Sequence, residues 1–300
     1  MSLYTHRDSN IRKTWLLFTI FLIVVIGLGW VFSQVFGSPD ILLIAVIFSV
    51  SMSFLSYWYS DKIVLRMAHA VPVERKTAPE LYNIVENLCI TAGLPVPRIY
   101  LVHESAPNAF ATGRNPEHAV VAVTTGLLDI LDRSELEGVI AHELSHIGNR
   151  DMLVSTMVVV LVGFISLASD FLMRSFFWGG FGGGRRERGN ANAIFLLIGL
   201  ALAILAPIGA MLIQLAISRK REFLADASGA LLTRYPDGLA LALEKISRNP
   251  TPLRVANNTT AHLWFDDPFK GGQKTSWWHK LFMTHPPAEE RIKALRGLEI

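Results

Sequence analysis

His142 and His146 are the residues whose types and spacing most clearly indicate chemistry, because they stand four positions apart in a segment of helical character. Side chains at such positions lie on one helix face about 6 Å apart, so both imidazoles can bind one zinc ion. Glu143 follows the first histidine, where its carboxylate could take a proton from a water at the metal. Polar residues flank the segment, which places it in water rather than in lipid. The pattern predicts a catalytic metal site.

A catalytic zinc site needs a third protein ligand and an open position for water. The best candidate is Glu222, which directly follows an apolar segment, and Asp226 stands one helical turn later. Asp226 could accept the second N–H of a ligating imidazole. Alternatively, both carboxylates belong to a solvated, charged helix end. With the histidine pair present, we favour the ligand role and predict one zinc ion per chain.

The composition excludes several classes of protein. Charged residues make up 18% of the 300 residues, compared with about 25% in typical soluble proteins, which argues against disorder and against an ordinary soluble enzyme. The single cysteine, Cys89, cannot form an internal disulfide. A net charge of +3 gives no support for nucleic-acid binding, so no nucleic-acid partner is expected.

Membrane segments are among the elements that must position the metal site. Between Thr14 and Ser60 the only charged residue is Asp40. Two apolar runs in this interval, residues 15–36 and 41–58, are long enough to cross a hydrocarbon core of about 30 Å and predict a helical hairpin. Lys and Arg residues flank both outer ends and are absent from the turn, so the positive-inside rule places both ends in the cytoplasm.

Two further apolar stretches, residues 153–173 and 193–217, are also long enough to span a membrane. The loop between them carries four arginines, which oppose the orientation that two full crossings require. Either the loop crosses despite its charge or the pair dips in without crossing. A third alternative is a pair of buried core helices. Two crossings and none both return the chain to the same side, so residues 61–152 and 219–300 can form one site.

The polar regions predict a mixture of helices and strands. Residues 134–137 read as a capping box that opens the zinc helix, and residues 105–113 could present an open backbone edge. The other expected elements are helices at residues 78–89, 125–131 and 239–246 and strands at 98–103 and 119–123.

These motifs together resemble the HtpX membrane metalloprotease family, a group of gluzincins related to the CaaX-prenyl endopeptidases. The resemblance covers nearly the whole chain. It rests on His142-Glu-Leu-Ser-His146 with Asn149-Arg-Asp151, on Ser218-Arg-x-x-Glu222-x-x-Ala-Asp226, on His285-Pro-Pro-x-x-x-Arg291, and on Asn108-Ala-Phe-Ala-Thr-Gly113.

The resemblance implies a multi-pass zinc metalloendopeptidase of the bacterial inner membrane, with its active site facing the cytoplasm. Its partners would be the lipid bilayer and polypeptide substrates, chiefly misfolded or damaged membrane proteins, in quality control and the stress response. Zinc would activate the water, and Glu143 would be the general base.

The remaining family positions have physical interpretations of their own. Asn108, Ala109, Phe110 and Ala111 could pair with an extended substrate by strand addition, or they could form a plain surface loop. His285 could stabilise an oxyanion, or it could belong to a helix start set by the prolines that follow it. Arg291 is expected to pair with a carboxylate, and we assign it no catalytic role.

Two segments, residues 179–188 and 263–283, depart from the family pattern. The second combines Trp, Phe and Lys residues, which suit a membrane interface. It could also form a lid over the cleft or an ordinary exposed loop. Neither segment carries a motif residue, so the departures concern specificity and topology.

Two other functions remain open. An intramembrane protease of the site-2 type would use Asp237 of Tyr235-Pro-Asp-Gly as a ligand, although that tetrapeptide more plausibly starts a helix. An inactive scaffold would keep zinc for structure, but structural zinc sites usually close the fourth position with Cys or His, and no Cys lies near either motif.

We therefore predict an α+β zinc metalloprotease domain, mainly helical with a small sheet, combined with about four transmembrane helices. The predicted division is residues 1–13 as a cytoplasmic N-terminus, 14–60 as a transmembrane hairpin, 61–152 as the first part of the protease domain, 153–217 as two further membrane helices joined by a Gly/Arg-rich loop, and 218–300 as the second part of the protease domain.

Overall fold

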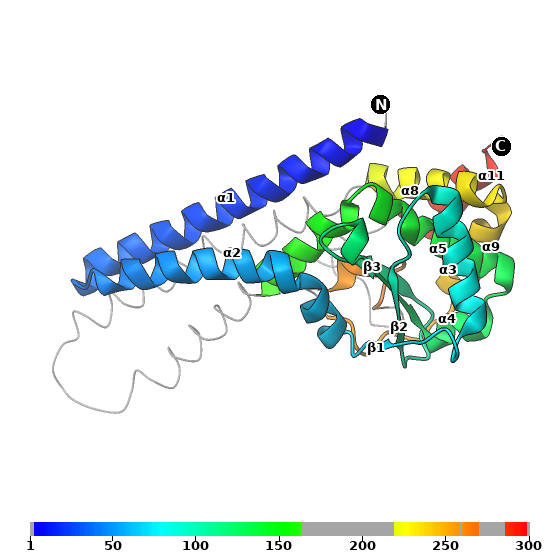
Figure 1. Cartoon of the computed structure of the whole chain (residues 1–300), viewed down its shortest axis with the longest axis horizontal. Helices are drawn as coiled ribbons and strands as arrows, with labels where there is room; N and C mark the ends of the chain where they lie inside the picture. Colours follow the sequence, from blue (N-terminus) through cyan, green and yellow to red (C-terminus); the bar gives the residue numbers. More distant parts are fainter. Residues whose placement is uncertain (1–2, 164–218, 258–259, 270–285, 299–300) are drawn as a thin grey trace.

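The computed structural model describes residues 3–163, 219–257, 260–269 and 286–298. A long helical hairpin extends from one side of a globular part, and the metal-site motifs lie in that globular part (Figure 1). The loop at 179–188, the stretch at 193–217 and most of the segment at 263–283 lie outside the described residues, so these predictions stay untested.

The hairpin consists of α1 (Leu3–Phe36) and α2 (Asp40–Met67). Both helices are long and apolar enough to cross a membrane. Gly37, with a φ of 64°, allows the tight turn between them. The two helices lie close together where Gly29 faces Ala45, since a side chain at this glycine would meet the Ala45 methyl group. The predicted pair of apolar helices is thus present.

A small mixed sheet forms the centre of the globular part. Its strand order is β1-β2-β4-β3, in which only β2 and β4 run parallel. The predicted strands at 98–103 and 119–123 correspond to β2 and β4, and residues 109–112 contribute an edge strand rather than a plain loop. The strands are β1 (Val71–Pro72), β2 (Arg98–Val102), β3 (Ala109–Thr112) and β4 (Val120–Thr124).

Helices cover the sheet and supply most of the core. Apolar positions of α3, such as Leu81, Ile84 and Val85, pack with Ile140 and Leu144 of α5 in the main hydrophobic cluster. The architecture is mainly helical with a small sheet, as predicted. The helices are α3 (Pro79–Ala92), α4 (Thr125–Ile130), α5 (Arg133–Gly148), α8 (Arg219–Thr233), α9 (Pro236–Arg248) and α11 (Ala288–Arg296), with short 3₁₀ turns at η1 (Pro116–His118) and η2 (Ala261–Leu263).

The first part of the third apolar stretch forms a helix at Asp151–Gly163. Val154, Val158 and Leu161 are buried against Leu17 and Phe21 of α1. This helix therefore connects the globular part with the base of the hairpin. The two candidate spans among the described residues are α1 and α2.

The predicted capping box at residues 134–137 is wrong by two positions. Asp132 is the N-cap of α5: its carboxylate accepts from the Glu135 N–H at 3.0 Å, and the Glu135 carboxylate accepts from the Asp132 N–H at 2.8 Å. Ser134 lies in the first turn and donates its hydroxyl to Asp132 at 2.8 Å. Asp and Ser are about equally good N-cap residues, so the sequence offered two overlapping capping boxes. The one that begins at Asp132 forms, and the one that begins at Ser134 does not.

Replacement of Asp132 by Ala should lower the free energy of unfolding by about 1 kcal/mol at pH 7. The hydrogen bonds from the Glu135 backbone and the Ser134 side chain lower the pKa of the Asp132 carboxyl. Its stabilisation is therefore complete above the unfolded-state pKa of about 4 and is lost as the pH falls through the folded-state value.

Thermal unfolding of both proteins at pH 7 and at pH 3 measures this effect. Asp132→Asn is the matched control, because a neutral amide still caps the helix but cannot titrate. A difference between wild type and Asp132→Ala that is equal at both pH values would contradict the assignment.

Candidate metal centre

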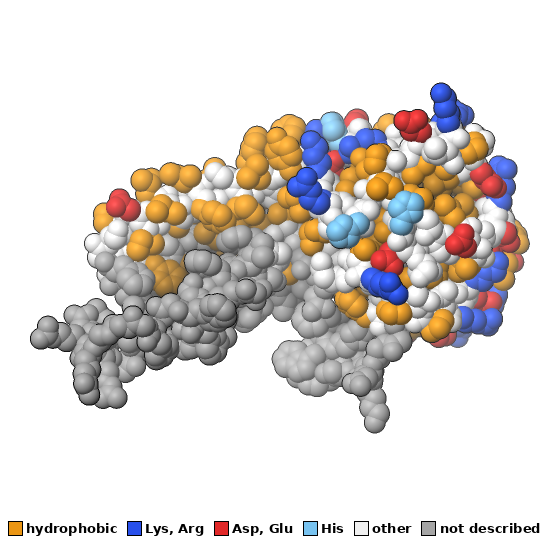
Figure 2. All heavy atoms as spheres, turned by 90° about the horizontal axis from the view of Figure 1, so that it is seen from below, with side chains coloured by type: hydrophobic (Ala, Val, Ile, Leu, Met, Phe, Trp, Pro, Cys, Tyr) orange, Lys and Arg blue, Asp and Glu red, His pale blue; other side chains and the backbone are white. Residues whose placement is uncertain are grey.

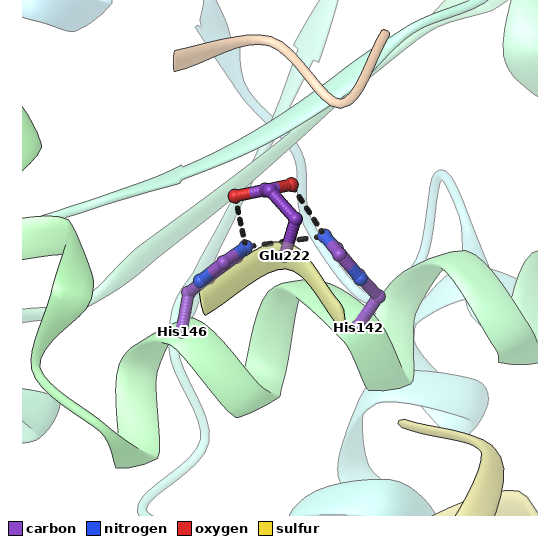
Figure 3. Close-up of side chains that lie close together, drawn as sticks. All are labelled: His142, His146 and Glu222. Atoms are coloured by element: carbon purple, nitrogen blue, oxygen red, sulfur yellow. Dashed lines mark hydrogen bonds and ion pairs between the residues drawn. The ribbon is translucent and has the colours of Figure 1, made fainter. Parts of the chain in front are cut away.

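Two packed helices bring the predicted ligands together. α5 carries His142 and His146, and α8 carries Glu222. In Figure 3 the two imidazoles and the carboxylate point toward one another. The backbones of the helices come close because α8 has Gly229 where it faces His142.

The ligand atoms have the spacing that a tetrahedral zinc ion needs. The two Nε2 atoms of His142 and His146 are 3.1 Å apart, and each lies 3.8 Å from one oxygen of Glu222. Two ligand atoms at zinc bond lengths and a tetrahedral angle are separated by ~3.3 Å. Among the described residues, these three form the group of His, Cys, Asp and Glu side chains that could hold a metal ion. The donor set fits zinc.

The orientation of the His142 imidazole is fixed by contacts to Nδ1, the ring nitrogen that does not face the other ligands. Its Nδ1 lies 2.9 Å from a carboxylate oxygen of Asp226, as predicted for a ligating imidazole. Asp226 is held in turn by two hydrogen bonds from the Arg291 guanidinium, at 2.6 and 2.8 Å. The ring of Phe265 packs edge-on against the imidazole at a centroid distance of 5.0 Å. Arg291 thus has the carboxylate partner expected from the sequence.

His146 has a corresponding partner that the sequence interpretation missed. Its Nδ1 lies 3.2 Å from a carboxylate oxygen of Asp151. The other oxygen of Asp151 accepts from the side-chain amide of Asn10 at 2.6 Å, and the same amide donates to the Asn149 carbonyl at 3.0 Å. The sequence did offer one indication of this contact, because Asp151 is an acidic residue just beyond the end of the zinc helix. Nothing in the sequence indicated Asn10, which comes from α1.

The electrostatics of the two imidazoles differ. Burial lowers the pKa of His142 to about 4, although the hydrogen bond with Asp226 opposes the shift. Burial also disfavours the charge on His146, but the hydrogen bond with Asp151 and the charge of Glu222 outweigh it and raise its pKa to about 9. The carboxylates around His146 therefore favour a positive charge at this point. A metal ion would replace that proton, because imidazole binds metal in its neutral form.

Glu143 is buried on α5 between the two histidines of the motif. Its negative charge contributes to the raised pKa of His146.

Residues 75–299 match Peptidase family M48, which is three quarters of the chain. The chain belongs to peptidase family M48. Two similar relatives are described as "Protease HtpX homolog": the one from Thermoanaerobacter pseudethanolicus is 47% identical over 99% of this chain and 98% of its own length, and the one from Caldanaerobacter subterraneus is 46% identical over 100% and 99%.

The fold of this M48 peptidase is also similar to a solved structure. A crystal structure of S. mikatae Ste24p superimposes with a TM-score of 0.50 at 20% identity, over 94% of this chain and 66% of that chain. This likeness concerns the fold alone. The HtpX-like relatives cover the helical hairpin as well, whereas the match to the M48 family begins after it.

The segment predicted to bind substrate is the edge strand β3 of the M48 domain. The Asn108 carbonyl accepts from Thr124 of β4 at 3.0 Å, so alternation directs the backbone groups of Ala109 and Ala111 away from β4. The Ala109 carbonyl already accepts from the Phe265 N–H at 2.8 Å, and the Phe110 ring is buried. Of the four predicted residues, Ala111 therefore faces the outer edge with both backbone groups.

Two other candidate residues lie elsewhere. His285 lies outside the described residues, so its two interpretations stay open. Asp237 is in the first turn of α9, where its carboxylate lies 3.9 Å from Arg296 and is more than half exposed. The helix that Tyr235-Pro-Asp-Gly was predicted to start is present as α9.

Replacement of Gly229 by Ala should weaken zinc binding at the M48 centre about tenfold, the lower end of the effect of disturbing a ligand's support. A methyl group at this position would lie 3.0 Å from the His142 amide nitrogen and 3.2 Å from its Cα. α8 must then move away from α5, which separates Glu222 from the histidines.

Competition with a chromophoric chelator measures the zinc affinity. Gly148→Ala is the matched control on α5, because its methyl group would meet only the Leu94 side chain at 3.8 Å. Equal zinc affinities of the two variants would show that the close helix contact does not set the ligand geometry.

Proposed function

We propose that this M48 peptidase is a zinc-dependent membrane endopeptidase that cleaves misfolded or damaged membrane proteins at the cytoplasmic face. The observation that carries the proposal is the convergence of His142, His146 and Glu222, with both imidazoles backed by carboxylates. A site of three ligands leaves one position open, which is typical of catalytic rather than structural zinc.

A zinc ion held by these three side chains would polarise the scissile carbonyl and lower the pKa of a water molecule. Asp226 and Asp151 keep the imidazoles in the orientation and protonation state that binding needs. The bidentate contact from Arg291 holds Asp226 ionised, in keeping with the lowering of its pKa to about 2. Arg291 acts as a positioning residue.

Glu143 is the group that we assign to proton transfer. Its carboxylate would remove a proton from the attacking water while the new bond to the carbonyl carbon forms. The same carboxylic acid would then deliver that proton to the leaving amine nitrogen as the peptide bond breaks. The carboxylate is thereby regenerated, so one residue serves both half-steps.

In this proposal, the edge strand β3 aligns the substrate. The Ala111 N–H and carbonyl could pair with an extended polypeptide along the outer edge of the sheet, which does not depend on side-chain identity. Backbone recognition of this kind suits unfolded segments of many sequences. This supports a substrate class of misfolded proteins rather than a single target.

The hairpin supports the membrane location. α1 and α2 both have the length and composition of spanning helices, and the metal centre lies in the globular part from which they extend (Figure 1). Lys and Arg residues flank the hairpin on the side of the globular part and are absent from the turn. By the positive-inside rule, this charge distribution supports an active site on the cytoplasmic side of a bacterial inner membrane.

The alternatives receive less support. In an intramembrane protease the zinc helix would lie within a span, but α5 is packed in the core of the globular part and belongs to neither candidate span. Asp237 is exposed on α9. A structural zinc site usually has a fourth Cys or His ligand, whereas the group found among the described residues consists of His142, His146 and Glu222.

The test is cleavage of a denatured membrane protein by the purified full chain in detergent. We expect activity to disappear after chelation and to return when one equivalent of zinc per chain is added. The side of the membrane on which the active site lies can be measured separately in sealed, right-side-out vesicles with a membrane-impermeant thiol reagent. The native Cys89 is buried and should not react. Ser38→Cys should be labelled from the outside and Lys76→Cys only after the vesicles are opened.

Either result can contradict its part of the proposal. A zinc-loaded chain that cleaves no unfolded polypeptide would favour the scaffold function. The reverse labelling pattern would place the active site on the other side of the membrane.

A further inference from the structure

A pocket lies where the hairpin joins the globular part. Its volume is about 660 Å³, and it is bounded by the last turns of α2 and by the ends of the sheet strands near Arg98 and Ala119. We call it the junction pocket. On the face seen in Figure 2, Lys and Arg side chains gather where the hydrophobic hairpin meets the globular part. A lipid headgroup would lie at this level if the hairpin is in a membrane.

Two cations of the junction pocket are held in place by aromatic rings. The Arg114 guanidinium lies over the Trp58 ring at 4.5 Å, and the Lys62 ammonium group lies over the Tyr59 ring at 5.1 Å. Both cations and both rings line the pocket. Stacking restricts these long side chains before any ligand arrives, so less conformational entropy is lost on binding.

The charges of the lining favour an anion. Three of its side chains are Lys or Arg and two are carboxylates, which leaves one net positive charge. The Asp61 carboxylate accepts from the Arg98 guanidinium at 2.6 Å and is buried, so that pair neutralises itself. The remaining charges of the lining are the two cations Arg114 and Lys62 and the one carboxylate of Glu117. A guanidinium and an ammonium group together are well suited to a phosphate ester.

An apolar stripe leads into the junction pocket along α2. It consists of large exposed side chains at intervals of three or four residues, which places them on one face of the helix. The stripe is formed by Leu43, Ile47, Val50, Phe54 and Trp58. Phe54 and Trp58 belong to both the stripe and the lining. A ligand with a charged head and long hydrocarbon chains matches this combination.

We propose that the junction pocket binds an anionic phospholipid. The phosphodiester contacts Arg114 and Lys62, and the acyl chains lie along the apolar stripe of α2. Bound lipid would fix the globular part against the membrane surface through α2. The proposal goes beyond the peptidase function and uses the membrane placement proposed above only for the source of the lipid.

The junction pocket is separate from the metal centre. It lies at the end of the sheet where β2 and β4 begin and β3 ends. The opposite end of β3, at Ala109, contacts Phe265, which packs against His142. Substitutions of Lys62 and Arg114 therefore leave the metal ligands and their partners unchanged.

Native mass spectrometry of the full chain released from detergent tests the proposal. The protein is titrated with phosphatidylglycerol, with phosphatidylcholine, which has the same phosphodiester and chains without net charge, and with glycerol 3-phosphate, which has no chains. We expect preferential binding of phosphatidylglycerol. The double variant Lys62→Gln/Arg114→Gln should bind it about tenfold more weakly.

The matched control is Arg248→Gln/Lys293→Gln, which removes the same charge from exposed positions on α9 and α11, away from the hairpin (Figure 1). Its lipid binding should equal that of the wild type, and Arg114→Lys should recover part of the loss. Thermal unfolding and peptide cleavage in detergent should match the wild type in all variants, so a defect in the peptidase site would be recognised separately.

Three results would overturn the proposal. An equal loss of phosphatidylglycerol binding in the two double variants would indicate general charge attraction. Equal binding of phosphatidylcholine would show that the headgroup charge is not recognised. Binding of glycerol 3-phosphate as tight as that of the lipid would make the pocket a site for a soluble phosphate ester.

Discussion

Replacement of Glu143 by Gln should leave zinc bound and reduce peptide cleavage at least about 100-fold, the lower end of what a general base contributes. The amide has nearly the same shape as the carboxylate but cannot accept the proton of the attacking water. The two histidines and Glu222 keep their positions on α5 and α8, so the metal content should stay at one equivalent per chain.

Metal analysis and cleavage of a denatured membrane protein measure the two halves of this expectation. Glu137→Gln is the matched control, since Glu137 is on the same helix and pairs with Arg133 at 3.0 Å. It should retain wild-type activity. Undiminished cleavage by Glu143→Gln would refute the assignment of the base.

Replacement of Glu222 by Ala should weaken zinc binding by more than about 100-fold, since the loss of an outer partner alone costs tenfold to 100-fold. The remaining two imidazoles cannot hold zinc in a catalytic geometry, and peptide cleavage should be lost together with the metal. Zinc affinity by chelator competition and circular dichroism separate loss of the ligand from loss of the fold.

Asp237→Ala is the variant that distinguishes this ligand set from that of the intramembrane alternative. Asp237 lies at the start of α9 beside Arg296, so its removal should leave the zinc affinity unchanged. Loss of zinc only in Asp237→Ala would replace the present ligand set with that of the intramembrane alternative.

The features that the sequence predicts well are local ones. The histidine pair depends only on the period of a helix, and the hairpin depends only on the length of two apolar runs. Glu222 required one longer inference, namely that the chain returns to the side of the membrane where α5 lies. Asp226 stands four residues after Glu222, so both carboxylates lie on one face of α8. That spacing was enough to predict the contact of Asp226 with His142.

Contacts between distant segments were beyond the reach of the sequence. Asn10 and Asp151 are 141 residues apart in the chain, and no pattern in either segment indicates the other. Phe265 reaches His142 from a segment that the sequence assigned to an interface, a lid or a loop. The capping box failed for the opposite reason, since two local candidates overlapped and the difference between Asp132 and Ser134 as caps is small.

The contact of Asn10 with Asp151 makes the first helix of the hairpin a part of the support of the candidate metal centre. A fragment released by a cut between hairpin and globular part would lose the amide that holds Asp151 and, through it, the orientation of His146. The match to the M48 family starts at residue 75, so a fragment trimmed to that boundary would be missing this support. If the proposed function holds, detachment of the globular part from the hairpin is expected to disturb His146 and lower the activity, which would confine proteolysis to the bilayer surface.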